Sequence, residues 1–245
     1  MSGLRLLWAP VRPGAAAEAV RAGRLGAGES GLGGFVGQAR QDQWYAARHT
    51  LRRGLLRLGL VPALPGAYRR IGLADPDAVR LVSWDGVALR PAVQFSVAHT
   101  AEQVVVAVRW ADPAPADPAP AGPGGGAGRG APDGLGVDVE TEWSTAERGL
   151  HRFGTDAELA VLGRACGSVR PLHLWCVKEA LAKASGLGFR VPPLRYRLRP
   201  GTGAPHRLAV RIDDGQPRPA RVRTGTRVAA DRPPAAWAVV DLPAR

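Results

Sequence analysis

The apolar positions of this chain follow a strand-like spacing in several separate segments. Residues 95–99 and 103–110 are rich in β-branched side chains, a composition typical of strands. Residues 134–140 alternate between apolar and polar positions, which predicts another strand. The pattern also predicts a first strand within residues 1–10 and short strands at residues 207–212 and 236–241.

Other segments carry the spacing and end signals of helices. In residues 38–58, apolar side chains recur at roughly helical intervals with arginines between them. Thr155 and Glu158 form a capping-box pattern before an apolar run, and Pro171 stands where a first helical turn tolerates proline. Gly186 marks the expected end of that last helix. Helices and strands in this order predict an α+β fold with mixed or antiparallel sheets.

One internal segment, residues 112–133, consists almost entirely of Pro, Ala and Gly. Such a composition cannot bury an apolar face, so we expect an extended, flexible insertion. The predicted strands on either side of it belong to a hairpin with an enlarged loop, or the segment is a hinge between two domains. We favour the hairpin, because a long surface loop costs little closure entropy. The chain thus divides into residues 1–111, the insertion and residues 134–245.

Length and composition indicate a globular protein with a sizeable core. The chain has 245 residues, of which 45% are hydrophobic, and no apolar run approaches the roughly 18 residues of a membrane span. We read the N-terminal residues as a strand and not as a signal peptide. Cys166 and Cys176 lack the spacing of a zinc site, so free thiols in a reducing cytoplasm are expected.

The chain is strongly basic, with a formal net charge of +12. This charge attracts anionic small molecules, an acidic protein or nucleic acid. The arginines are dispersed and lack the aromatic stripe of a nucleic-acid surface, so a nucleic-acid-binding module is the weakest of these readings.

Only two lysines occur, Lys178 and Lys183, among 33 basic residues. An ammonium differs from a guanidinium because it is a compact point charge that can give up a proton, so confinement of lysine to one segment suggests a specific role. Glu179 lies four residues before Lys183, on the same helical face. The alternative is an ordinary solvated ion pair on a helix surface.

The strand at residues 134–140 places two carboxylates, Asp138 and Glu140, on one face. They belong to a solvent-exposed polar face, or they bind a cation. If Glu179 approaches the same place, three carboxylates suit Mg²⁺, whose remaining positions are commonly filled by water and substrate phosphates. The residues then point to a metal-dependent reaction on a phosphorylated substrate.

Four motifs follow one another along the chain: a basic-Pro turn at residues 89–91, a strand ending in His99, a Gly-x-Asp-x-Glu strand at residues 136–140 and a Trp-x-x-Lys-Glu-Ala-x-x-Lys helix at residues 175–186. In this order they resemble the motifs of the 4′-phosphopantetheinyl transferases of the monomeric, Sfp-like kind. The resemblance covers roughly residues 29 to 190. It implies a pseudo-dimer of two similar α+β halves, with coenzyme A held in the cleft between them.

The resemblance also implies roles for individual residues. Asp138, Glu140 and Glu179 correspond to the Mg²⁺ ligands, and Glu179 or a water near it corresponds to the base that deprotonates the carrier serine. Lys183 corresponds to the cation that neutralises the departing 3′,5′-ADP. The remaining expected coenzyme A contacts are Arg48, Arg90, His99 and Lys178. Ser96 and Ala98 depart from the family pattern, which has Asn and Ser there.

The expected function is transfer of 4′-phosphopantetheine from coenzyme A to a serine of an apo carrier protein. We expect a cytoplasmic monomer that acts on acidic carrier domains, which the positive charge attracts. The alternative is a catalytically weakened coenzyme A or carrier-protein binder of the same fold. His99 and Arg48 also have interpretations without a ligand: His99 as a buried residue of its strand, and Arg48 as a solvated residue of its helix.

Overall fold

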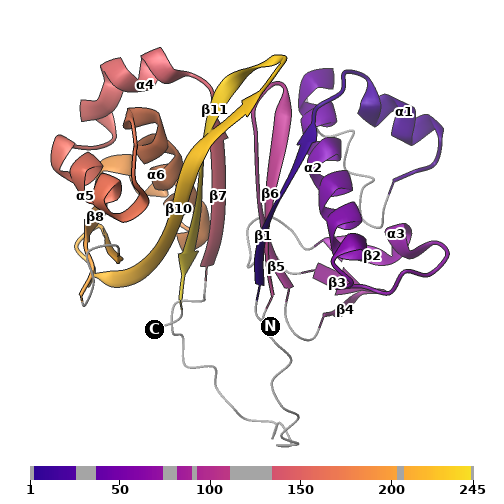
Figure 1. Cartoon of the computed structure of the whole chain (residues 1–245). Helices are drawn as coiled ribbons and strands as arrows, with labels where there is room; N and C mark the ends of the chain where they lie inside the picture. The colour runs from indigo at the N-terminus through magenta and orange to yellow at the C-terminus, as the bar shows by residue number, and fades with distance from the viewer. Residues whose placement is uncertain are drawn as a thin grey trace, which may run out of the picture.

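The computed structural model describes residues 3–25, 37–73, 82–89, 93–110, 134–202 and 207–243. Figure 1 shows two sheets side by side in the middle of the molecule, with helices on their outer faces. The helices and strands confirm the α+β class. Among the described helices, none has the length and apolar character needed to cross a membrane.

The first sheet is antiparallel, with strand order β1-β6-β5. Its strands are β1 (Gly3–Pro10), β6 (Gln103–Trp110) and β5 (Val93–His99). On its outer face lie α1 (Ala15–Arg21), α2 (Gln38–Arg57) and α3 (Ala67–Arg70). A small sheet beside them consists of β2 (Ile71–Leu73), β3 (Val82–Trp84) and β4 (Val87–Ala88).

The second sheet has five strands in the order β7-β11-β10-β9-β8. In chain order they are β7 (Gly134–Glu140), β8 (Tyr196–Pro200), β9 (Leu208–Ile212), β10 (Arg218–Ala229) and β11 (Arg232–Leu242). Its outer face is covered by α4 (Trp143–Gly149), α5 (Asp156–Cys166) and α6 (Pro171–Ser185). Short 3₁₀ turns are η2 (Leu150–Arg152), η3 (Gly188–Arg190) and η4 (Pro193–Arg195).

Successive side chains of a strand point to opposite faces of its sheet, and in both sheets each face is packed. On β6, Val106 and Val108 face the α2 side, whereas Val105 and Ala107 enter a core shared with the second sheet. On β7, Val137 enters that shared core together with its apolar neighbours on the same face. The two sheets therefore pack against one another through apolar side chains, and each has its helices on the other side.

The hairpin expected across residues 112–133 was wrong. Strand β6 pairs with β1 and β5, whereas β7 pairs with β11 in the other sheet. The strands on either side of residues 112–133 therefore lie in different sheets. The insertion itself lies outside the described residues.

The predicted helix ends are confirmed. Helix α2 matches the helix expected at residues 38–58. Thr155 Oγ1 accepts a hydrogen bond from the Glu158 N–H at 3.2 Å, and α6 begins at Pro171 and ends before Gly186, whose φ is 69°. Cys166 and Cys176 are free thiols.

Candidate functional site

Strand β7 and helix α6 approach closely because two glycines face the helix. A Cβ on Gly136 would lie 1.8 Å from the Ala180 carbonyl oxygen, and one on Gly134 would lie 1.7 Å from the Ala184 carbonyl oxygen. Residues two apart on a strand share a face, so Asp138 follows the glycines on the side that faces α6. The alternative of a solvent-exposed acidic face is excluded for Asp138, which is only 4% exposed.

Lys183 joins the helix to the acidic strand. Its Nζ donates to Asp138 Oδ1 at 2.8 Å and to the Val137 carbonyl oxygen at 3.0 Å. Asp138 Oδ2 is also buried, and no group in the described residues makes a full hydrogen bond to it. Burial raises the pKa of Asp138, and the Lys183 ammonium and then the Cys176 thiol oppose that rise. The site thus contains a buried carboxylate whose charge Lys183 and Cys176 compensate only in part.

Glu140 and Glu179 lie within electrostatic reach of Asp138. Burial first, and then the charge of Asp138, raises the pKa of Glu140 to about 7. The same two causes raise the pKa of Glu179 to about 7, and Glu140 adds to the effect. The structure therefore brings together the three carboxylates that the sequence singled out, and their mutual repulsion is only partly offset by Lys183.

The first sheet contributes a histidine to the same region. His99, at the end of β5, accepts a hydrogen bond at Nε2 from Arg40 Nη1 at 3.2 Å. Burial lowers the pKa of His99 to about 4, with further contributions from the charges of Arg40 and Lys183. His99 is therefore neutral at physiological pH. It lies close enough to Lys183 for that charge to be felt, so both sheets meet at this site.

Arg40 was missed by the sequence reading, although a signal for it existed. Arg40, Trp44 and Arg48 are spaced by four residues, which places them along one face of α2. The Arg48 guanidinium carbon lies 3.7 Å from the centroid of the Trp44 ring, a cation–π contact. Arg48 thus shares a helix face with the Arg40 that contacts His99. Arg90 lies outside the described residues.

Ser96 links the two sheets directly beside the acidic pair. Its side chain is fully buried, and its Oγ accepts a hydrogen bond from the Val137 N–H at 3.1 Å. The Val137 carbonyl group is bound by Lys183, so both backbone groups of this residue are satisfied by side chains. The serine at position 96 therefore has a structural consequence, because its hydroxyl group holds the backbone immediately before Asp138.

Lys178 does not join the carboxylates, which corrects the expectation that it contacts coenzyme A. Five residues of helix rotate a side chain by about 140°, so Lys178 and Lys183 leave α6 in different directions. The Lys178 ammonium is buried and binds Glu158 and the Tyr196 carbonyl oxygen. Burial lowers its pKa, and Glu158 opposes that change. Lys178 therefore stabilises the packing of α6 on α5 and β8.

Lys178→Met should destabilise the protein by about 3–5 kcal/mol, because it leaves the Glu158 carboxylate buried without its cation. The double variant Lys178→Met/Glu158→Gln should recover much of that loss. Urea unfolding of both variants measures the difference. A single variant as stable as the wild type would contradict the structural role of this ion pair.

The carboxylate set fits a divalent cation in its chemistry. Among the described residues, no three acidic, histidine or cysteine side chains already form a metal-binding group. Asp138 Oδ2 nevertheless lacks a full hydrogen bond, and burial, followed by the charge of Asp138, raises the pKa values of Glu140 and Glu179. Hard oxygen ligands of this kind suit Mg²⁺. The three side chains therefore have the charge and the free oxygen that such an ion requires.

Comparison with known families identifies the part of the chain that holds this site. Residues 134–230 match the family model of the 4′-phosphopantetheinyl transferase superfamily. This stretch runs from β7 through α6 to the end of β10 and includes all three carboxylates and Lys183. Residues 134–230 are thus similar to the 4′-phosphopantetheinyl transferase superfamily. A search of curated proteins gave no match.

Proposed function

We propose that the chain transfers 4′-phosphopantetheine from coenzyme A to a serine of an apo carrier protein. One observation carries the proposal: Asp138, Glu140, Glu179 and Lys183 converge between β7 and α6, within the stretch that matches the superfamily. Phosphoryl transfer needs positioning and charge neutralisation more than unusual side chains. The three carboxylates can hold a cation, and Lys183 supplies a positive charge.

We infer the Sfp-like arrangement, in which residues 1–111 and 134–245 form two similar halves around the substrate. The basic residues of the first half support it, since Arg40 and His99 lie toward Lys183 of the second. Coenzyme A carries a 3′-phosphate and a pyrophosphate, so Arg40, Arg48 and His99 are suited to the nucleotide end. Arg90 is proposed for the same role from its motif alone.

Mg²⁺ is the proposed metal, with Asp138, Glu140 and Glu179 as its ligands. When bound, the ion would neutralise charge on the pyrophosphate and orient it. Lys183 would remain as the neighbouring cation that compensates the departing 3′,5′-ADP. The metal is supported by the orphaned Asp138 oxygen and by the repulsion within the acidic set.

The bond changes and the proton transfer of the proposed reaction can each be assigned to a group. The carrier serine Oγ forms a bond to the phosphorus that bears the pantetheine arm, and the bond from that phosphorus to the 3′,5′-ADP oxygen breaks. The serine proton passes to Glu179 or to a water near it, which acts as the general base. Lys183 stabilises the negative charge that develops on the leaving group.

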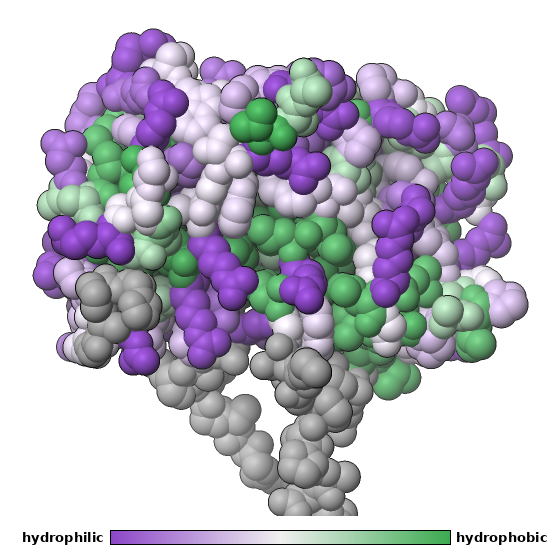
Figure 2. All heavy atoms as spheres, in the orientation of Figure 1, coloured by the Kyte–Doolittle hydropathy of each residue, from purple (hydrophilic) through white to green (hydrophobic). Residues whose placement is uncertain are grey.

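The proposed partner is an acidic carrier domain, met by a monomeric enzyme in the cytoplasm. The net charge of +12 would speed such an encounter. Hydrophilic side chains are spread over the face in Figure 2 and do not form one stripe, with apolar surface between them near the middle. On this face, the pattern favours a compact protein partner over nucleic acid.

Mass spectrometry of an apo carrier protein incubated with this protein, Mg²⁺ and coenzyme A tests the proposal. We expect the carrier to gain the mass of one phosphopantetheine group, with 3′,5′-ADP as co-product. A carrier in which the acceptor serine is replaced by alanine is the control. Binding of coenzyme A or carrier without any mass gain, over a panel of carriers, would favour the non-catalytic alternative.

The raised pKa values predict a pH-dependent stability that Mg²⁺ should offset. Glu140 and Glu179 have an ordinary pKa of 4.5 and a folded pKa of about 7. Their protonated forms are favoured by folding, so stability is full below pH 4.5 and is lost as the pH rises toward 7. In chelator, Tm should therefore fall across this range more in the wild type than in Glu140→Gln/Glu179→Gln.

Thermal denaturation at several pH values measures that difference. At pH 7.5, Mg²⁺ should raise the Tm of the wild type and leave the double variant unchanged, because ligand binding to the folded state stabilises it. Equal Tm profiles for both proteins, or an equal response to Mg²⁺, would argue against the acidic set as a cation site.

A further inference from the structure

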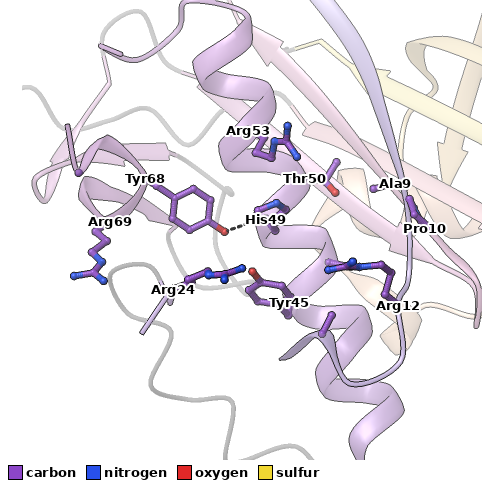
Figure 3. Close-up of a pocket in the computed structure, with 13 residues that line it drawn as sticks. Ala9, Pro10, Arg12, Arg24, Tyr45, His49, Thr50, Arg53, Tyr68 and Arg69 are labelled. Atoms are coloured by element: carbon purple, nitrogen blue, oxygen red, sulfur yellow. Dashed lines mark hydrogen bonds between the residues drawn. The ribbon is translucent and has the colours of Figure 1, made fainter. Parts of the chain in front are cut away.

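A cavity of about 590 Å³ lies in the first half, apart from the acidic site. It is bordered by the end of β1, by α1 and α2, and by the turn that leads into α3. Four arginines line it, namely Arg12, Arg24, Arg53 and Arg69. Figure 3 shows that Arg12 and Arg24 extend toward the space beside Tyr45 from two separate segments. The volume is within the usual range for small-molecule sites.

The cavity carries excess positive charge. Among the described residues, Glu18 is the acid that pairs with its arginines, at 4.0 Å from Arg12 and 3.6 Å from Arg24. Arg69 donates to the Gly23 carbonyl oxygen, and the guanidinium of Arg53 has no ion pair or hydrogen bond within the described chain. The cavity thus has four guanidinium groups and one carboxylate, so its net charge is positive and favours an anion.

A second, independent observation also points to a ligand. Thr50 lines the cavity, is only 9% exposed, and its Oγ1 has no hydrogen-bond partner in the described structure. A helical threonine hydroxyl commonly binds the carbonyl group one turn earlier, and here it does not. Buried hydroxyls are rarely left without a partner. Because the Thr50 side chain lines the cavity, a rotation of this buried hydroxyl would let it donate to a phosphate oxygen there.

Aromatic rings form another part of the wall. The rings of Tyr45 and His49 are stacked at a centroid distance of 5.6 Å, and His49 Nδ1 lies 2.9 Å from Tyr68 Oη. Figure 3 shows this contact beside the arginines. The cavity therefore combines guanidinium groups, which bind phosphate, with planar rings on which a base can stack.

This cavity is separate from the proposed coenzyme A contacts on the same helix. At about 100° per residue, Arg40, Trp44 and Arg48 occupy one arc of α2, and Tyr45, His49 and Arg53 occupy another centred about 140° away. Arg48 and His99 do not line the cavity. A ligand here would therefore bind in addition to coenzyme A.

We propose that this cavity is a second anion site that binds a small phosphorylated molecule. Arg12, Arg24 and Arg53 hold its phosphates, Thr50 Oγ1 donates to one of their oxygens, and the Tyr45 ring lines the same cavity. The proposal stands independently of the proposed transfer reaction. Inorganic pyrophosphate and a nucleoside diphosphate share the required chemistry, and titration of each distinguishes them.

Calorimetric titration of the full chain with pyrophosphate and with ADP, without Mg²⁺ and with saturating coenzyme A to occupy its own site, tests this cavity. Arg53→Gln should weaken binding of both by about tenfold, and Thr50→Val, which keeps the shape but removes the hydroxyl, should weaken it several-fold. Tighter binding of ADP than of pyrophosphate would assign the site to nucleotides, and equal binding would assign it to the phosphates alone.

A control variant makes the outcome decisive. Arg57→Gln removes an exposed charge one turn further along α2, outside the cavity, and should leave both affinities unchanged. With coenzyme A bound at its own site, pyrophosphate binding that survives both Arg53→Gln and Thr50→Val would overturn the proposal. An absence of binding by the wild type would overturn it as well.

Discussion

Asp138→Asn is expected to lower the turnover of carrier modification by on the order of 10²–10³-fold, the cost of removing one preorganised electrostatic group. The amide keeps the size of the side chain and can still accept from Lys183, but it removes the buried negative charge. Folding should be little affected, because burial already disfavours the charged form of Asp138, as its raised pKa indicates. The measurement is kcat at saturating coenzyme A and Mg²⁺, with urea unfolding of the same samples.

Asp213→Asn is the matched control. Asp213 is exposed and pairs with Arg195 on the surface of the second half, so its loss should change neither turnover nor stability measurably. Near-wild-type turnover of Asp138→Asn would remove Asp138 from the proposed site. A large loss of stability in that variant would instead give this carboxylate a structural role.

Gly136→Ala should destabilise the protein by about 3 kcal/mol or more and reduce turnover of the molecules that still fold. The new Cβ would lie 1.8 Å from the Ala180 carbonyl oxygen and 3.0 Å from the Ala184 nitrogen. These are backbone atoms, so no rotamer change relieves the contact and α6 must move away from β7. That movement separates Lys183 from Asp138. Urea unfolding and kcat of the soluble fraction measure the two effects.

Gly163→Ala provides the comparison within the same half. A Cβ at Gly163, inside α5, meets its nearest neighbour at an ordinary 3.5 Å. This substitution should stabilise the helix by up to about 1 kcal/mol, because alanine loses less conformational entropy than glycine. If Gly136→Ala behaves like Gly163→Ala, the close strand–helix contact does not position the site.

The acidic site could be predicted because its signals are local and follow one another in the chain. Alternation along residues 134–140 placed Asp138 and Glu140 on one strand face, and helical spacing paired Glu179 with Lys183. The structure adds the reason that these two segments meet, which is the pair of glycines facing α6. Sequence spacing alone does not reveal which strand a helix covers.

The misassigned features depend on contacts between distant segments. Lys178 was grouped with Lys183 because the two lysines are neighbours in sequence, but helical rotation directs Lys178 to Glu158. The strands beside residues 112–133 were expected to pair, because adjacent strands often do. Instead, β6 pairs with β1 and β5, and β7 pairs with β11. The arginine cavity joins segments from three parts of the first half, and no local motif marks it.

The hydrogen bonds at Val137 have a consequence for the solubility of the protein. Strand β7 ends its sheet, and a sheet edge with unpaired backbone groups is a template on which another chain can add a strand. Ser96 occupies the N–H of Val137 and Lys183 occupies its carbonyl oxygen, so a foreign strand would have to displace both. The contacts that hold the strand beside Asp138 in place therefore also protect this edge against aggregation.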